Sequence, residues 1–187
     1  MVVVLFVGFG GNASARGYVC GELLQSPVDA SPADGFATSS MGNQHLSPGS
    51  GINYALCPPT SGGHYNAAGR GPLRPGFYGP DDGAGPSGWV HNLEHGFVVA
   101  LYRCDEGECP SSAELDALHG FVANGPLTTV SCGYRSKVLA ARFDDMATPY
   151  ALLAWDRALL LETFDEEAAL GFASRWIDQT GPEPNSC

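Results

Sequence analysis

The chain has 187 residues, a formal net charge of -11 at pH 7 and a sequence pI near 4.6. This length suits a single domain with a sizeable core. The 9 lysines and arginines are scattered without a basic run, which argues against nucleic acid or an anionic membrane surface as a partner. No segment approaches the roughly 20 consecutive apolar residues that a membrane-spanning helix needs, so we expect no membrane insertion.

The N-terminal residues are typical of an export signal. Val2–Phe9 is an apolar run, and Ala13-Ser14-Ala15 has the small residues of a cleavage site. A positively charged region before the run is missing, and a buried strand is the alternative interpretation. We predict a signal peptide over residues 1–15, followed by a secreted or periplasmic protein that starts near Arg16.

Six cysteines, an even number without a Cys-x-x-Cys pair, favour disulfides over a zinc knuckle or a redox motif. Cys104 and Cys109 bracket a short acidic turn, and we predict that they pair. The other four cysteines allow three pairings, among which the sequence does not choose; they are Cys20, Cys57, Cys132 and Cys187. Disulfides are typical of exported proteins, as the predicted signal peptide also indicates.

The chain divides into two unlike parts. From about Ser26 to Gly88 the chain is rich in Gly, Pro, Ser and Asn, the residues of turns. Aromatic residues recur among them, which is unusual for a disordered linker. We therefore predict one domain, in which an ordered, loop-rich wrap over 16–88 is pinned by a disulfide around a core over 89–187.

The second part shows ordinary secondary-structure signals. Phe97–Tyr102 is a continuous apolar run and predicts a strand that is buried on both faces. Ser111-Ser112-Ala113-Glu114 is a capping box, which predicts a helix from there to about Asn124.

Three further elements follow in this part. Lys137–Phe143 and Tyr150–Leu161 are predicted to be strands, and Glu166–Asp178 a helix with one apolar face. The order strand, helix, strand, strand, helix predicts an α+β fold. It would have a small mixed sheet, two main helices and a long loop-rich, disulfide-pinned N-terminal wrap.

The segment His91-Asn92-Leu93-Glu94-His95-Gly96 places two histidines four residues apart with a carboxylate between them. On a helical turn such positions share a face, and imidazole is the commonest metal ligand in proteins. We expect at most one or two helical turns here, because Gly88 precedes the segment closely and an apolar strand follows. Four of the five histidines fall between residues 45 and 95: His45, His64, His91 and His95.

These motifs resemble a known family. Cys57–Tyr65, which reads Cys-Pro-Pro-Thr-Ser-Gly-Gly-His-Tyr, and Val90–Gly96 resemble the two signature segments of the bacterial "domain of unknown function 3105" family. His45 stands where that family has a further histidine, and Ala154–Arg157 resembles its C-terminal part. The resemblance covers roughly residues 41 to 184. It implies that the histidines act as a set, and it implies no reaction.

We predict that this set forms one mononuclear site for a transition-metal ion, copper or zinc. The expected ligands are His64, His91 and His95, completed by His45 or Glu94. Oxidised cysteines would offer no thiolate, which leaves imidazole and carboxylate donors that suit copper and zinc alike. We favour copper slightly.

Two other side chains bear on this site. Met146 is a possible soft ligand for copper, although methionine more often fills gaps in a core. His119 lies beside the apolar stripe of the helix that starts near Ser111, and we expect a structural role for it.

Three functions follow from these residues. The first is an exported metal-binding protein that sequesters, delivers or senses copper or zinc. The second is a metalloenzyme, either a copper oxidoreductase or a zinc hydrolase with Glu94 as general base; His91-x-x-Glu94-His95 formally matches the inverted zinc-peptidase motif. In the third, the histidines only hydrogen-bond the wrap to the sheet. Four protein ligands would indicate binding, and three with an open position would indicate catalysis.

Overall fold

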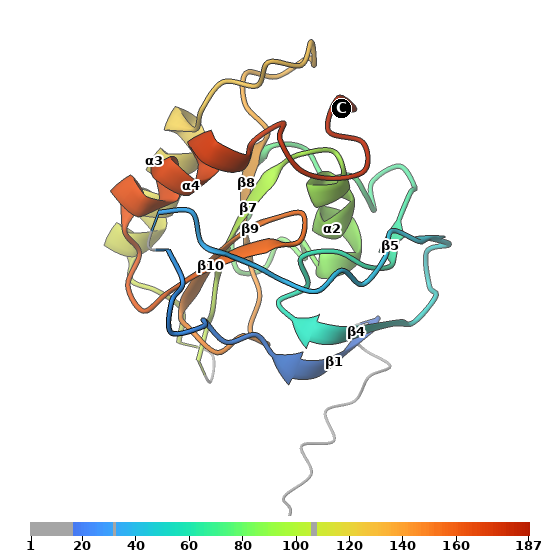
Figure 1. Cartoon of the computed structure of the whole chain (residues 1–187), viewed down its shortest axis with the longest axis horizontal. Coiled ribbons are helices and arrows are strands. Elements are labelled where there is room, and N and C mark those ends of the chain that lie inside the picture. Colours follow the sequence, from blue (N-terminus) through green and yellow to red (C-terminus); the bar gives the residue numbers. More distant parts are fainter. Residues whose placement is uncertain (1–16, 32, 106–107) are drawn as a thin grey trace, which may run out of the picture.

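The computed structural model describes residues 17–31, 33–105 and 108–187. The predicted signal peptide, residues 1–15, lies outside these residues. The described part contains three helices and several sheets, so the predicted α+β class is confirmed. Figure 1 shows the layers, with the main sheet between one helix on one side and two helices on the other.

The main sheet has six strands and is mixed, as predicted. Its strands follow the order β2 (Phe36–Ala37), β10 (Arg157–Leu161), β9 (Tyr150–Ala154), β7 (Val98–Tyr102), β8 (Val138–Arg142) and β6 (Gly76–Phe77). The central strand β7 runs parallel to β8 and antiparallel to β9. All five of its residues are buried, which confirms the predicted strand.

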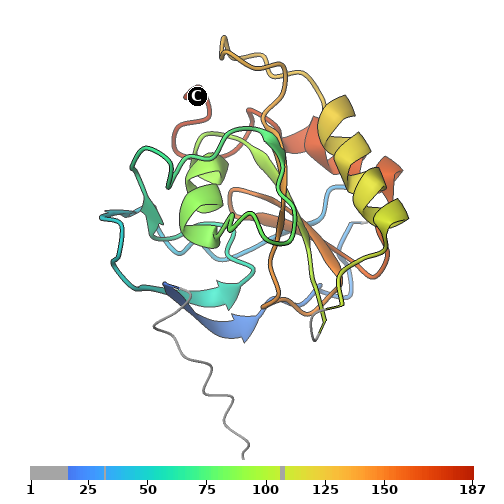
Figure 2. The ribbon, with the colours of Figure 1, turned by 180° about the vertical axis from the view of Figure 1, so that it is seen from behind.

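Alternation along β7 explains why both faces of the sheet are covered. Val99 and Leu101 point into a core cluster with α2 (Pro86–Glu94). Their neighbours Val98 and Ala100 point to the other face, into a cluster with α3 (Ser112–Asn124) and α4 (Glu166–Trp176). Figure 2 shows these two helices side by side. A strand with no solvent face needs apolar residues throughout, as β7 has.

Helices α3 and α4 lie where the sequence predicted them, within two residues at their ends. The Ser111 side chain accepts a hydrogen bond from the Glu114 backbone, and the Glu114 carboxylate accepts one from the Ser111 backbone at 2.9 Å. The predicted capping box is therefore confirmed. Helix α4 ends at Trp176, two residues before the predicted end.

The prediction of one strand over Tyr150–Leu161 was wrong. This segment is a hairpin in which Arg157 pairs with Ala154, so that Trp155 and Asp156 form a two-residue turn. Asp156 has φ 54°, a conformation that Asp tolerates better than most residues. The turn lacks glycine, the usual sequence signal for such a hairpin.

Helix α2 is longer than the one or two turns expected. It has nine residues and starts at Pro86, a favoured residue for the first helical position. Gly88 lies inside the helix, where it does not act as a breaker. A Cβ at Gly88 would lie 2.6 Å from the Arg70 carbonyl oxygen, so this glycine allows the wrap to approach the helix closely.

The wrap is ordered and contributes strands of its own. Strands β1 (Tyr18–Leu23) and β4 (Ile52–Cys57) form a parallel pair, as do β3 (His45–Leu46) and β5 (His64–Tyr65). Strands β2 and β6 add to the two edges of the main sheet.

All six cysteines are paired. The predicted Cys104–Cys109 disulfide is confirmed, Cys20–Cys57 pins the wrap, and Cys132–Cys187 holds the C-terminal residues. Three disulfides suggest an oxidising, extracellular environment.

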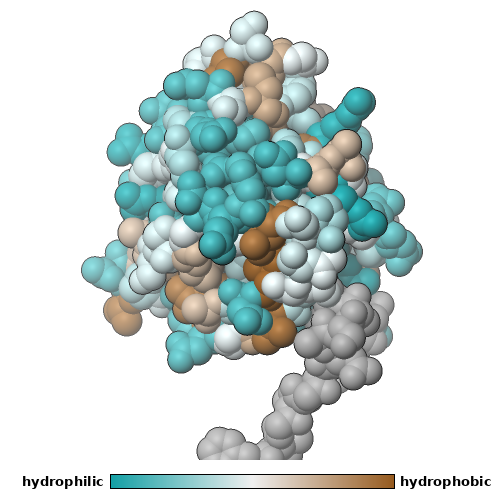
Figure 3. Space-filling model, turned by 90° about the vertical axis from the view of Figure 1, so that its right-hand side faces the viewer, coloured by the Kyte–Doolittle hydropathy of each residue, from teal (hydrophilic) through white to brown (hydrophobic). Residues whose placement is uncertain are grey.

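The surface carries few large apolar side chains. Among the described residues these are Val19, Leu23, Val28 and Leu127. Figure 3 shows one face, where hydrophilic residues predominate around a narrow apolar stripe. None of the described helices is both long enough and apolar enough to cross a membrane.

Candidate metal centre

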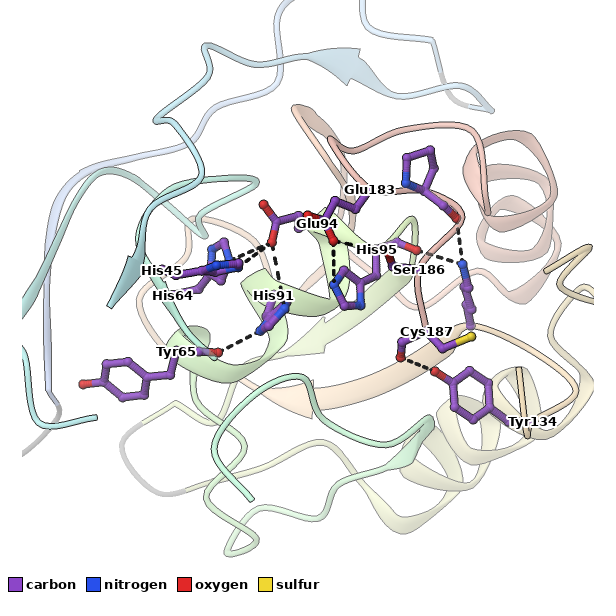
Figure 4. A network of polar contacts seen from close by, with 12 residues as sticks. His45, His64, Tyr65, His91, Glu94, His95, Tyr134, Glu183, Ser186 and Cys187 are labelled. Carbon is purple, nitrogen blue, oxygen red and sulfur yellow. Dashed lines mark hydrogen bonds and ion pairs between the residues drawn. The ribbon is translucent and has the colours of Figure 1, made fainter. Parts of the chain in front are cut away.

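Four side chains from the wrap and from α2 converge at one point (Figure 4). His45 comes from β3, His64 from β5, and His91 and Glu94 from the last turns of α2. Their potential ligand atoms all lie within 4.8 Å of one another, so this group can hold a metal ion. We refer to these four residues as the His–Glu cluster.

One carboxylate oxygen lies at the centre of the cluster. Glu94 Oε2 is 2.9 Å from Nε2 of His64, 3.0 Å from Nε2 of His45 and 3.9 Å from Nε2 of His91. The parallel pairing of β3 with β5 places His45 opposite His64. The i,i+3 spacing on α2 places His91 and Glu94 on one face of the helix.

Backbone carbonyls orient two of the imidazoles. His64 Nδ1 donates to the Gly62 carbonyl and His91 Nδ1 donates to the Tyr65 carbonyl, both at 2.8 Å. Because a carbonyl can only accept, each Nδ1 carries the hydrogen, and the neutral ring then presents a lone pair at Nε2. Metal-ligating histidines are typically held in this way.

The electrostatics of the cluster favour a cation. Burial acts to raise the pKa of Glu94, but His64 and His45 outweigh it and hold the pKa below its usual range. Glu94 Oε2 and His64 Nε2 face each other at 2.9 Å. A metal ion could be held between these two atoms, because a carboxylate oxygen and an imidazole nitrogen are both metal donors.

His91 is adapted to remain neutral. Burial lowers its pKa from 6.5 to about 4, and the hydrogen bond to Tyr65 offsets this only in part. An imidazole ligand must be unprotonated at the atom that binds the metal. His91 therefore meets this condition at neutral pH.

The cluster is buried except at one ligand. The side chains of His64, His91 and Glu94 are at most 2% exposed, whereas that of His45 is 42% exposed. His45 is therefore the member of the cluster on the solvent side.

His95 lies outside the His–Glu cluster. It is the C-cap of α2, and its backbone N–H still donates to the His91 carbonyl at 3.2 Å, so the i,i+4 relation to His91 holds. Its Nε2 lies 3.6 Å from Glu183 Oε2. Its ring contacts the His91 ring edge-on, with centroids 4.6 Å apart. Of the four histidines predicted as ligands, three come together, and Glu94 joins them.

Other side chains around the site have different positions. Met146 is buried in the core cluster that includes α2. His119 is exposed, and its ring contacts Phe77. Sequence reasoning missed Trp155, whose ring lies edge-on to His64 with centroids 6.5 Å apart. Only the unrecognised hairpin turn brings this tryptophan to the site.

Comparison with known proteins identifies a family. No curated protein and no solved structure matches the chain. A family model described as "Protein of unknown function (DUF3105)" matches residues 45–187, a region that begins at His45 and contains the whole His–Glu cluster. Since this match covers most of the chain, the protein belongs to the DUF3105 family, as its motifs predicted.

Proposed function

We propose that the protein binds one divalent transition-metal ion, copper or zinc, through the His–Glu cluster. The observation that carries this proposal is the convergence of three Nε2 atoms on Glu94 Oε2, with the Nδ1 hydrogens of His64 and His91 fixed on backbone carbonyls. In this proposal Glu94, which the sequence offered as a completing ligand, belongs to the ligand set, and His95 does not. A cation at this point would be within reach of the carboxylate and of the imidazole nitrogens, all of which are metal donors.

The donor set favours Cu²⁺ or Zn²⁺. Three imidazoles and a carboxylate are borderline donors that suit both ions, and the paired cysteines leave no thiolate. A set without sulfur does not favour Cu⁺. At a given nitrogen and oxygen site Cu²⁺ binds more tightly than Zn²⁺, so we propose that the cluster binds Cu²⁺ more tightly than Zn²⁺.

The number of ligands supports binding over catalysis. Four protein ligands close the coordination shell, as in sites that hold a metal without turning over a substrate. Glu94 would be a ligand and would not be free to act as a general base. The role we propose is sequestration, delivery or sensing, for which the exposed His45 offers a route for ion exchange.

We further propose that this role is carried out outside the cytoplasm, in a secreted or periplasmic protein. The three disulfides support this location, as does the apolar N-terminal run of the sequence.

Metal analysis tests the proposal. The protein is loaded with Cu²⁺ or Zn²⁺, freed of unbound ion and analysed beside His64→Ala/His91→Ala. The matched control is His119→Ala, which removes an exposed histidine outside the cluster. We expect about one ion per chain in the wild type and the control, and substantial loss in the double variant. Negligible metal in all three would favour the alternative in which the histidines only hydrogen-bond the wrap to the sheet.

A further inference from the structure

The C-terminal residues 178–187, which we call the strap, lie across the end of α2 (Figure 4). The Glu183 backbone donates to the Glu94 carbonyl at 3.0 Å, and the Asp178 backbone donates to the Gly96 carbonyl at 2.9 Å. The last carbonyls of a helix have no partner within the helix. The strap supplies a hydrogen-bond donor to the carbonyl of Glu94, which is the last residue of α2 and a member of the His–Glu cluster.

Lys137 ties the strap to the same helix end. Its ammonium group is fully buried and donates to the carbonyls of His95 at 2.9 Å and Pro184 at 2.8 Å. It also forms an ion pair with Asp178 at 2.9 Å. A cation is favourable at the C-terminal end of a helix, where the helix dipole is negative. Three chain segments therefore meet at one charged group.

The strap approaches α2 as closely as glycine permits. Gly181 has φ 105°, and a Cβ there would collide with the Glu94 carbonyl oxygen. The far end is anchored by the Cys132–Cys187 disulfide and by a hydrogen bond from the Tyr134 hydroxyl to the Cys187 carbonyl. The strap is thus fixed on both sides of its contact with Glu94.

We propose that the strap positions Glu94, so that its carboxylate stays where the three Nε2 atoms converge. This inference rests on the proposed metal binding. Helix ends fray unless they are held, and a metal ligand must be kept within about 0.5 Å of its working position. Lys137 is then a positioning residue, which acts on the metal through the backbone of residues 94 and 95.

The test removes the anchor of the strap. Cys132→Ser/Cys187→Ser is compared with Cys104→Ser/Cys109→Ser, which removes a disulfide that does not include the strap. The affinity for Zn²⁺ is measured by competition with a chelator. We expect the strap variant to bind about 10–100-fold more weakly, the usual effect of losing support for a ligand, and the control to bind as the wild type does.

A second arm asks whether the effect passes through Glu94. The strap variant is repeated in a Glu94→Gln background, where we expect most of the additional loss to disappear, since coupled residues are not additive. Lys137→Met/Asp178→Asn should behave like the cysteine variant. As an independent readout, the Cu²⁺ electron paramagnetic resonance spectrum of both strap variants should shift towards that of Glu94→Gln.

The outcomes separate the two proposals. A wild type that binds neither ion overturns the proposed function. A wild type that binds, with strap variants of equal affinity and unchanged spectrum, overturns the positioning role alone. Equal losses in the wild-type and Glu94→Gln backgrounds also overturn it, because the strap would then act on stability in general.

Discussion

His45 and His64 lie directly opposite each other in the parallel pair β3–β5, with ring centroids 4.8 Å apart. One side chain is 42% exposed and the other is fully buried. This pairing gives the proposed site one ligand at the surface and one in the core. The two histidines should therefore contribute differently to the binding and the exchange of metal.

We expect His45→Ala to keep one ion per chain but to release it faster to a chelator, because water can replace a ligand at the surface. His64→Ala should lose most of the affinity for Zn²⁺, because His64 is fully buried and water replaces a buried ligand less easily than an exposed one. Stopped-flow release of Zn²⁺ and equilibrium competition measure the two effects. Equal losses of affinity and equal release rates in both variants would contradict the distinction.

The stability of the metal-free protein should depend on pH through His91. Burial lowers the pKa of His91 from 6.5 to about 4, so between these values the unfolded chain binds a proton that the folded protein does not. The free energy of unfolding should therefore fall as the pH falls from 6.5 to 4, and the contribution of His91 is fully present above that range. Three charged or titratable neighbours also act on the pKa of His91: His95 and His64 lower it, and Glu94 raises it.

Urea unfolding at a series of pH values measures this dependence. His91→Asn, whose amide can still donate a hydrogen bond towards Tyr65, should show a shallower fall than the wild type. Parallel curves for the two proteins would show that the pH dependence comes from other groups.

Lys137→Met should destabilise the protein by about 3–5 kcal/mol, because it leaves the buried carboxylate of Asp178 without its positively charged partner. Burial acts to raise the pKa of Asp178, and hydrogen bonds from Lys137 and from Thr129 and Thr128 outweigh it and lower the pKa. Removing both charges in Lys137→Met/Asp178→Asn should recover much of the loss. Urea unfolding measures both variants, and a double variant no more stable than Lys137→Met would count against this explanation.

Ser111→Ala should lower stability by about 1 kcal/mol, the usual cost of a lost N-cap. Because α3 packs on the face of the sheet opposite to α2, this change should leave the affinity for Zn²⁺ unaltered. Thermal unfolding and chelator competition measure the two properties. A loss of affinity in this variant would mean that stability and metal binding are coupled across the sheet.

The elements predicted well from the sequence are those with local signals. The capping box at Ser111 and the apolar run of β7 each determine one element without help from distant residues. The hairpin turn at Trp155 and Asp156 has no glycine to mark it in the sequence. The start of α2 was also missed, because Gly88 suggested a break at a position where the helix continues.

The candidate site was predicted in part for a similar reason. The clustering of histidines along the chain pointed to His45, His64 and His91. The position of His95 could not be predicted, because its ring lies near Glu183 of the strap, which comes from residues far along the chain. Likewise the Cys132–Cys187 disulfide joins residues 55 apart, whereas the short Cys104–Cys109 loop was recognisable.

Because the His–Glu cluster is mostly buried, an ion would have to lose water from its hydration shell to bind there. An ion arriving at the proposed site with its hydration shell would meet His45 first, since the other three side chains are at most 2% exposed. To reach the buried Nε2 atoms it must exchange bound water for protein donors. Mg²⁺ dehydrates reluctantly and prefers oxygen, whereas Cu²⁺ and Zn²⁺ accept imidazole nitrogen. We therefore expect the proposed site to favour Cu²⁺ or Zn²⁺ over Mg²⁺.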